Sequence, residues 1–148
     1  MGIARVSQAC PELAERVSPE HLGFIRANGD RHITQKSFDH YKGGGSETDV
    51  LLEYRADGEL VGLSFTACPN GHSEHSITVV RQDFRNRGIG TALMRVKKEM
   101  AAARGCQLQS LVAESNTPSV RMCSKVFTAR EVHEGKYIFY DGGVSCAG

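Results

Sequence analysis

One stretch of the chain decides the fold: residues 77–91 read ITVVRQDFRNRGIGT. It begins with β-branched residues typical of a strand and ends in glycines that precede a regular apolar pattern. The first N–H groups of a helix have no partners within it, and that end carries partial positive charge. Gly88 and Gly90 let a ligand approach the backbone, while Arg85 and Arg87 can pair with phosphate oxygens. The stretch therefore predicts an anion site suited to a pyrophosphate.

The helix that follows is predicted from apolar residues spaced three and four apart. They are Ile89, Leu93, Val96, Met100 and Ala103. Gly105 is a suitable end for this helix. The pair Lys97-Lys98 is interpreted as part of its solvated face.

Two common phosphate-binding loops do not fit residues 77–91. A P-loop needs GxxxxGK followed by Ser or Thr, and the sequence contains no such string. A dinucleotide-binding loop needs GxGxxG, and Leu93 stands where the third glycine belongs. The strands before the loop are also predicted to be antiparallel, unlike those of a dinucleotide-binding fold.

The flanking segments predict a mixed α/β domain. Before the loop we expect strands at residues 50–56, 60–67 and 76–80, with a tight hairpin at Asp57-Gly58. After the central helix we expect a strand at 107–113, a helix from Asn116 or Thr117 to about Val126, and a closing hairpin around 134–136. The fold class is thus α/β with a mixed sheet, in which an antiparallel meander leads into a β-α-β crossover and a C-terminal hairpin.

The N-terminal part is less regular. We expect a short strand at residues 3–7, a helix at 11–17 and a second helix opening at Pro19, with Leu22, Phe24 and Ile25 facing the core. Residues 30–41 show no clear pattern, and residues 43–46, GGGS, form a flexible joint. Because about 40 residues rarely fold alone, residues 1–148 are interpreted as one domain, with a variable part at 1–45 and a core at 50–140.

The composition limits the partners and the cellular setting. With 40% hydrophobic and 24% charged residues the chain can bury a core, and its net charge of +1 argues against a general polyanion binder. We expect neither a membrane span nor a signal peptide. The five irregularly spaced cysteines favour a reducing, cytoplasmic setting. Cys68, His72 and His75 cluster without a fourth ligand, so we expect no metal site.

Residues 85–90, RNRGIG, are similar to the motif Arg/Gln-x-x-Gly-x-Gly/Ala of the GCN5-related N-acetyltransferase (GNAT) family. The flanking residues 77–84 and 91–94 are also similar to that family. The resemblance continues at residues 116–119, NTPS, and 125–127, KVF, which look like the family's second coenzyme segment. In all, about residues 50–140 resemble the family, while the first 45 match only in the coarse order of elements.

This resemblance implies an acyltransferase that uses acetyl-coenzyme A. Backbone groups near Val79 and Val80 would pair with the pantetheine arm as an added strand does. Asn116 would contact the coenzyme from the second helix, and the pyrophosphate would be held by amides of Arg85, Asn86, Arg87, Gly88, Ile89, Gly90 and Thr91. The acyl carbonyl would lie where the strands at 76–80 and 107–113 splay apart. A substrate amine would attack the thioester directly, so the enzyme would position the reactants, polarise the carbonyl by a backbone N–H and move protons.

The acid and the base are less clearly marked. The family's usual tyrosine, which would protonate the leaving thiolate, aligns with Cys123, and the glycine before Phe127 is missing. A thiol can donate a proton or simply pack in a core, and the other candidates are Tyr137, Tyr140 and Ser124. For the base, Glu114 at a strand end is favoured over Glu74 and His75, although each carboxylate can also be an ordinary surface group.

Three functions are consistent with these patterns. The first is transfer of an acetyl group from acetyl-CoA to a primary amine of a small molecule, peptide or protein. The second is a binding or regulatory module that keeps the fold without catalysis, which the loss of the tyrosine motivates. The third is an acetyltransferase for aminoacyl-tRNA, which the near-neutral charge disfavours. A homodimer is one option, since many similar proteins pair through their final strands.

Overall fold

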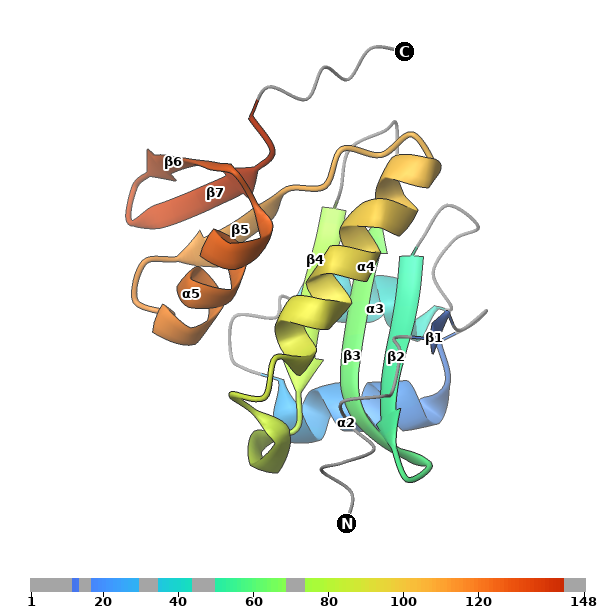
Figure 1. The fold of residues 1–148 in the computed structure, drawn as a ribbon. Coiled ribbons are helices and arrows are strands. Elements are labelled where there is room, and N and C mark those ends of the chain that lie inside the picture. The colour runs from blue at the N-terminus through green and yellow to red at the C-terminus, as the bar shows by residue number, and fades with distance from the viewer. Residues whose placement is uncertain (1–11, 14–16, 30–34, 44–49, 69–73, 143–148) are drawn as a thin grey trace.

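The computed structural model describes residues 12–13, 17–29, 35–43, 50–68 and 74–142. Their strands form two antiparallel sheets (Figure 1). The larger has the order β1-β2-β3-β4 and is built from β1 (Glu12–Leu13), β2 (Val50–Ala56), β3 (Glu59–Ala67) and β4 (Glu74–Val80). The smaller has the order β5-β7-β6 and is built from β5 (Ser110–Ala113), β6 (Ala129–His133) and β7 (Lys136–Tyr140).

Helices cover both faces of the larger sheet (Figure 1). One face packs on α2 (Pro19–Asn28) and α3 (Gln35–Lys42), and the opposite face packs on α4 (Ile89–Ala103). The helix α5 (Thr117–Val126) lies beside α4 and covers the smaller sheet. The chain thus passes from β4 through α4 to β5, which carries it from one sheet to the other. This arrangement confirms the predicted mixed α/β class with a meander, a crossover and a final hairpin.

The β2–β3 hairpin forms where the sequence predicts it. Asp57 and Gly58 have φ values of 52° and 82°, which is the backbone of a two-residue type I′ turn. Ala56 pairs with Glu59 directly beside the turn. The central helix is also confirmed, since α4 begins at Ile89 and Gly105 follows its end with φ of 74°.

The N-terminal part differs from expectation. The helix predicted at 11–17 is wrong, because Glu12 and Leu13 form β1 and pair with Glu53 and Leu52 of β2. This pairing is remote in sequence and outweighs the local helical pattern. The helix α3 occupies part of the stretch 30–41, which the sequence left unassigned. The strand predicted at 107–113 starts only at Ser110. Residues 3–7 and 44–46, for which a strand and a flexible joint are predicted, lie outside the described residues.

An ionic and capping network fixes α2 on β2. Ser18 caps α2 through His21, with Ser18 N–H donating to His21 Nδ1 at 2.9 Å. The other ring nitrogen of His21, which is 3% exposed, lies 2.6 Å from Glu53 Oε2 on β2. Arg55 adds ion pairs to Glu20 at 2.7 Å and to Glu53 at 2.8 Å. The orientation of α2 is therefore set by specific polar contacts as well as by its buried Phe24 and Ile25.

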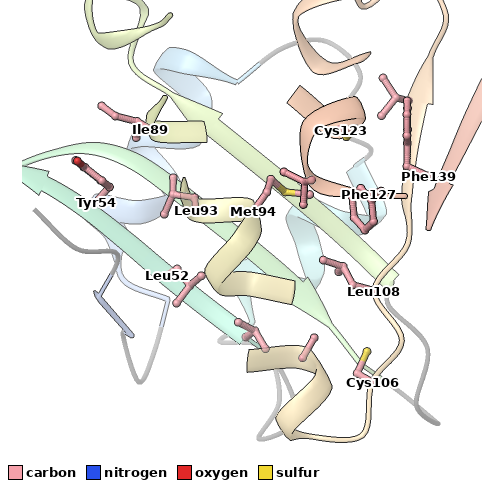
Figure 2. Close-up of a cluster of buried hydrophobic side chains, with 14 of the residues drawn as sticks. Leu52, Tyr54, Ile89, Leu93, Met94, Cys106, Leu108, Cys123, Phe127 and Phe139 are labelled. Carbon is pink, nitrogen blue, oxygen red and sulfur yellow. The ribbon is translucent and has the colours of Figure 1, made fainter. Parts of the chain in front are cut away.

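The core on the α4 side joins both sheets. Figure 2 shows Leu52 and Tyr54 from β2, Leu93 and Met94 from α4, and Phe139 from β7 in one cluster. Each of these five side chains is at most 4% exposed. Continuous apolar packing between α4, α5 and the two sheets therefore holds the sheets together.

Gly62 of β3 allows α4 to approach the sheet. A Cβ atom at this position would lie 2.9 Å from Ile89 Cγ2, 3.0 Å from Leu93 Cδ1 and 3.2 Å from Tyr54 Cβ. These distances are shorter than ordinary van der Waals contacts between carbon atoms. The first turn of α4 therefore rests directly on the backbone of β3.

We predict that Gly62→Ala lowers the free energy of unfolding by about 1–3 kcal/mol, because the added methyl overpacks the helix–sheet contact. Gly23→Ala is the matched control. A Cβ at this exposed α2 position meets no atom within 4 Å, so that variant should be about 0.5–1 kcal/mol more stable than wild type. Urea denaturation of both variants measures the difference, and equal stabilities would contradict the proposed contact.

Candidate active site

The edge of β4 that faces away from β3 has no partner among the described strands. Among the described strands β4 pairs with β3 alone, and β5 pairs with β7 alone. The backbone N–H of Arg81 donates to Val61 O at 2.8 Å. Backbone groups alternate between the two sides of an antiparallel strand, so those of Val79 face β3, while those of Thr78 and Val80 face the open edge. Thr78 and Val80 therefore offer main-chain groups to any ligand lying in the split between β4 and β5.

The turn after β4 leads directly to the start of α4. A short 3₁₀ segment, η2 (Gln82–Phe84), is followed by Asn86 with φ of 63° and by Gly88 with φ of 80°. Gly88 is the N-cap of α4 and supplies no side chain to bond the first amides. The first bond into the helix is that of Ala92 N–H to Gly88 O at 3.0 Å. The amides of Ile89, Gly90 and Thr91 therefore point out of the helix end, where an anion can bind them.

The two glycines of this turn serve different purposes. At Gly88 the positive φ favours glycine, and a Cβ there would meet no atom within 4 Å. At Gly90 a Cβ would lie 2.8 Å from Met122 Sδ of α5 and 3.6 Å from Val80 Cγ2. Gly90 thus lets α5 pack closely on the first turn of α4, whereas Gly88 leaves the outer side of the turn open.

Two arginines around the turn, Arg81 and Arg85, already form ion pairs or hydrogen bonds with other residues. Arg81 forms ion pairs with Asp83 at 2.7 Å and Glu59 at 3.1 Å, and its hydrogen bonds hold the pKa of Asp83 below its usual range. Arg85 donates to two main-chain oxygens, Val80 O and Asn28 O, each at 3.0 Å. Arg85 therefore ties the end of β4 to the end of α2.

Arg87 is held differently. Its guanidinium lies 4.8 Å from the centre of the Phe84 ring, and that of Arg81 lies 4.7 Å from the same ring. Arg87 is exposed and makes no hydrogen bond with another described residue. Of the two arginines predicted to meet phosphate, Arg87 is therefore the one whose guanidinium donates to no other described residue.

The second predicted coenzyme segment forms the start of α5. Asn116 is its N-cap, with Thr117 and Pro118 in the first turn, and its side chain does not cap the helix. Its backbone N–H donates to Ala113 O at 2.9 Å. The end of β5 and the start of α5 are thus held together in one tight turn.

Cys123 lies on α5 (Figure 2), and none of its surface is exposed. Burial raises the pKa of this thiol, while a hydrogen bond with Ser110 and the charge of Lys97 lower it. The net pKa shift is upward, so the thiol remains protonated at neutral pH. Its protonation state suits a proton donor, but a substrate atom can reach it only if the side chains that cover it move.

The predicted carboxylates are placed less clearly. Glu114 is exposed just beyond β5, and its backbone N–H donates to Gly135 O of the β6–β7 turn at 3.0 Å. Glu74 and His75 begin β4, but their side chains lie outside the described residues. Of the other acid candidates, Ser124 donates to Val120 O at 2.7 Å, and Tyr137 lies under Arg130 at 4.5 Å.

Lys97 is the residue that sequence reasoning misplaced. It is completely buried, and its Nζ donates to Ser76 Oγ at 2.8 Å, Phe65 O at 3.1 Å and Thr78 Oγ1 at 3.3 Å. The expectation that Lys97 belongs to a solvated face is wrong. The buried face of α4 comprises Ile89, Leu93, Met94, Lys97 and Ala101, while Val96 and Met100 are partly buried and Ala103 is exposed.

A sequence signal for this burial does exist. Lys97 stands four residues after Leu93 and four before Ala101, in the middle of an apolar row. A lysine in such a row is ordinarily assigned to solvent because burying its charge is costly. The hydroxyls of Ser76 and Thr78, alternating along β4, were the complementary signal.

Lys97 should make stability depend on pH. Burial lowers its pKa from 10.5 to about 7, so between these values the unfolded chain binds a proton that the folded chain does not. The contribution of Lys97 to stability therefore rises with pH, by about 2 kcal/mol from pH 7 to pH 9. Urea denaturation at both values measures it, and Lys97→Met should lack this rise. An equal rise in wild type and variant would contradict the buried state.

Among the residues that the structure describes, no three His, Cys, Asp or Glu side chains come close enough to hold a metal ion. His72 and the side chain of His75 lie outside those residues. In the same part of the chain, no helix is long and apolar enough to cross a membrane.

Comparison with known proteins identifies the family. A family model described as the acetyltransferase (GNAT) family matches residues 14–127. The match spans most of the chain and includes the turn, α4 and α5. The chain therefore belongs to the GNAT family of acetyltransferases.

Two curated relatives are each 29% identical to this chain. Mycothiol acetyltransferase of Clavibacter sepedonicus matches over 105 residues, which is 70% of this chain and 32% of that protein. Acetyltransferase plu1384 of Photorhabdus laumondii matches over 94 residues, 63% of this chain and 65% of that protein. The match thus spans less than two thirds of the length of either relative.

Solved structures share the fold. A protein from Klebsiella pneumoniae, whose structure is described as that of an acyl-CoA N-acyltransferase, superposes on this chain with a TM-score of 0.73 at 14% identity. The superposition covers 91% of this chain and 97% of the Klebsiella protein. An acetyltransferase of Bacillus subtilis in complex with CoA gives a TM-score of 0.65 at 15% identity, covering 90% and 98%. At these identities the likeness establishes the fold alone.

Proposed function

We propose that this protein is an N-acetyltransferase that moves an acetyl group from acetyl-CoA to a primary amine. One observation carries the proposal: the uncapped start of α4 at Gly88 lies beside the unpaired edge of β4. The first feature suits a pyrophosphate, and the second suits the amide-bearing pantetheine arm. GNAT membership and the CoA bound to the Bacillus subtilis protein support the combination.

The described residues fit such a co-substrate. The amides of Ile89, Gly90 and Thr91 would hold the pyrophosphate, with Arg87 as the nearby cation. Gly88 leaves open space on the outer side of the turn. Along β4 the groups available to the pantetheine arm are those of Thr78 and the N–H of Val80, because Val80 O is engaged by Arg85. Asn116 at the start of α5 would complete the site.

The chemistry requires little covalent work from the protein. Acetyl-CoA supplies an activated thioester, and the amine nitrogen attacks its carbonyl carbon directly. The Thr78 N–H, which faces the open edge, would donate to the carbonyl oxygen as negative charge develops there. A neutral amine is needed for attack, and exposed Glu114 or Glu74 would take its proton through water. The leaving sulfur would take a proton from Cys123 or from solvent.

A second function is favoured by one observation. Cys123, at the position that the sequence resemblance aligns with the family's usual tyrosine, is wholly buried and has a raised pKa. A chain without an accessible acid can still bind the coenzyme, so a binding or regulatory module is the alternative.

Coenzyme binding is tested by thermal unfolding. Acetyl-CoA at about 100 times its Kd should stabilise the wild-type protein by about 2.7 kcal/mol. Gly88→Glu should abolish this shift because it places a carboxylate at the phosphate position. Gly135→Glu in the β6–β7 turn is the matched control, since Gly135 also has φ of 80° and open space around it. A shift retained in Gly88→Glu would locate the coenzyme elsewhere, and no shift in wild type would reject the proposed function.

Catalysis is tested by release of CoA thiol with a panel of primary amines. Cys123→Ala should lower kcat by about 100-fold at unchanged coenzyme affinity, since a lost general acid costs on this order. Cys106→Ala, at another buried position of the same core, should leave kcat unchanged. A Cys123→Ala protein with wild-type kcat would exclude the thiol as the acid. Coenzyme binding without thiol release across the panel would favour the module.

A further inference from the structure

Lys97 is an unusual element of this core. It is 0% exposed, and among the described residues its Nζ has no carboxylate partner. Burying a lysine costs several kcal/mol unless its charge is compensated, and an apolar side chain at this position would avoid that cost. An ionisable amine kept at this cost on the inner face of α4 points to a role other than packing.

The position of Lys97 relates it to the split between the sheets. Its Nζ bonds the side chains of Ser76 and Thr78, both on β4. The main-chain groups of Thr78 face the open edge of this strand. Ser64 Oγ, 2.8 Å from Thr78 Oγ1, fixes the same side chain from β3. Lys97 thus contacts, through Thr78, the backbone segment that borders the proposed thioester site.

We propose that Lys97 is a positioning residue whose ammonium group orients Thr78 and supplies positive charge beside the site where the thioester carbonyl is polarised. This inference rests on the proposed function. In the reaction a carbon–nitrogen bond forms and the carbon–sulfur bond breaks, and the electron pair leaves with sulfur. The nitrogen gives up one proton and the sulfur takes one up. Negative charge therefore develops on the carbonyl oxygen and then passes to the sulfur. The ammonium group of Lys97 would attract this charge, and the low dielectric of the core would strengthen the attraction.

A purely structural role is the competing explanation. The β3–β4 register shifts between Phe65 and Ala67, and Lys97 also bonds Phe65 O at this irregularity. Lys97 could then serve only to satisfy a carbonyl oxygen at the bulge. The two roles differ in what they require of the proton: a neutral amine can still donate to Phe65 O, but only the ammonium form adds charge to the split.

The surroundings of Lys97 leave its charge sensitive to pH near neutrality. Ser76, Thr78 and Phe65 O, which face it from β4 and β3, do not titrate. Among the described residues, the titratable groups that act on it are Cys123 of α5 and Cys68 after β3, and burial lowers its pKa to about 7. The cation is therefore present below neutral pH and lost above it.

Infrared difference spectroscopy of bound acetyl-CoA, labelled with ¹³C at the thioester carbonyl, tests the proposal on the full chain. In wild type the carbonyl stretch should lie below that of free acetyl-CoA, and the downshift should be larger at pH 6 than at pH 8.5. Lys97→Met should show a smaller downshift that does not change with pH. Lys98→Met is the matched control, because Lys98 bonds Val126 O and Asp141 away from β4 and should behave as wild type.

The outcomes separate the two explanations. A full, pH-dependent downshift in Lys97→Met would overturn the proposal and leave Lys97 a structural residue. If that variant fails to fold, the wild-type series decides alone, since a downshift that is the same at pH 6 and pH 8.5 would also overturn it. No bound carbonyl band in wild type would reject the proposed function itself, whereas a bound but unshifted carbonyl would reject only the role of Lys97.

Discussion

The contact between the first turn of α4 and the backbone of β3 at Gly62 is the constraint on which the rest of the structure depends. Because Ile89 and Leu93 rest on β3, the helix start lies directly beside the end of β4. The helix then carries the chain over the sheet and delivers β5 to a second sheet. The open edge of β4 and the uncapped amides of α4 are therefore two consequences of one packing arrangement.

The charges around the turn follow from the same geometry. Arg81 and Arg85 are engaged with neighbouring carboxylates and carbonyl oxygens, so they shape the turn and connect it to α2. Main-chain amides are then the main groups available to bind an anion. Of Arg81, Arg85 and Arg87, only Arg87 makes no hydrogen bond with a described residue. This division explains why glycine at position 88 matters more to the proposed site than the number of arginines. A backbone site depends on φ and on open space, both of which a side chain would alter.

Local patterns predicted much of this fold. The type I′ hairpin at Asp57 and Gly58, the span of α4 and the closing hairpin all follow from short-range turn and periodicity rules. β1 could not be predicted in this way, because Glu12 and Leu13 form a strand only through pairing with β2, which is remote in sequence. In the candidate site the turn, α4 and the start of α5 were anticipated. The engagement of Arg85 with Val80 O and Asn28 O was not, since it depends on where α2 ends in space.

The burial of Lys97 and its hydrogen-bond partners could not be predicted from the sequence alone. Its place in an apolar row of α4 and the hydroxyls of β4 are each visible in the sequence, but neither alone outweighs the cost of burying an amine. Only the register of β4 against β3 brings Ser76, Thr78 and Phe65 O to the same point in space. Among the described residues its Nζ has no carboxylate partner, which leaves its charge uncompensated there. An uncompensated cation next to an unpaired strand edge is an arrangement suited to negative charge that appears only during a reaction, because a permanent counter-ion would cancel it.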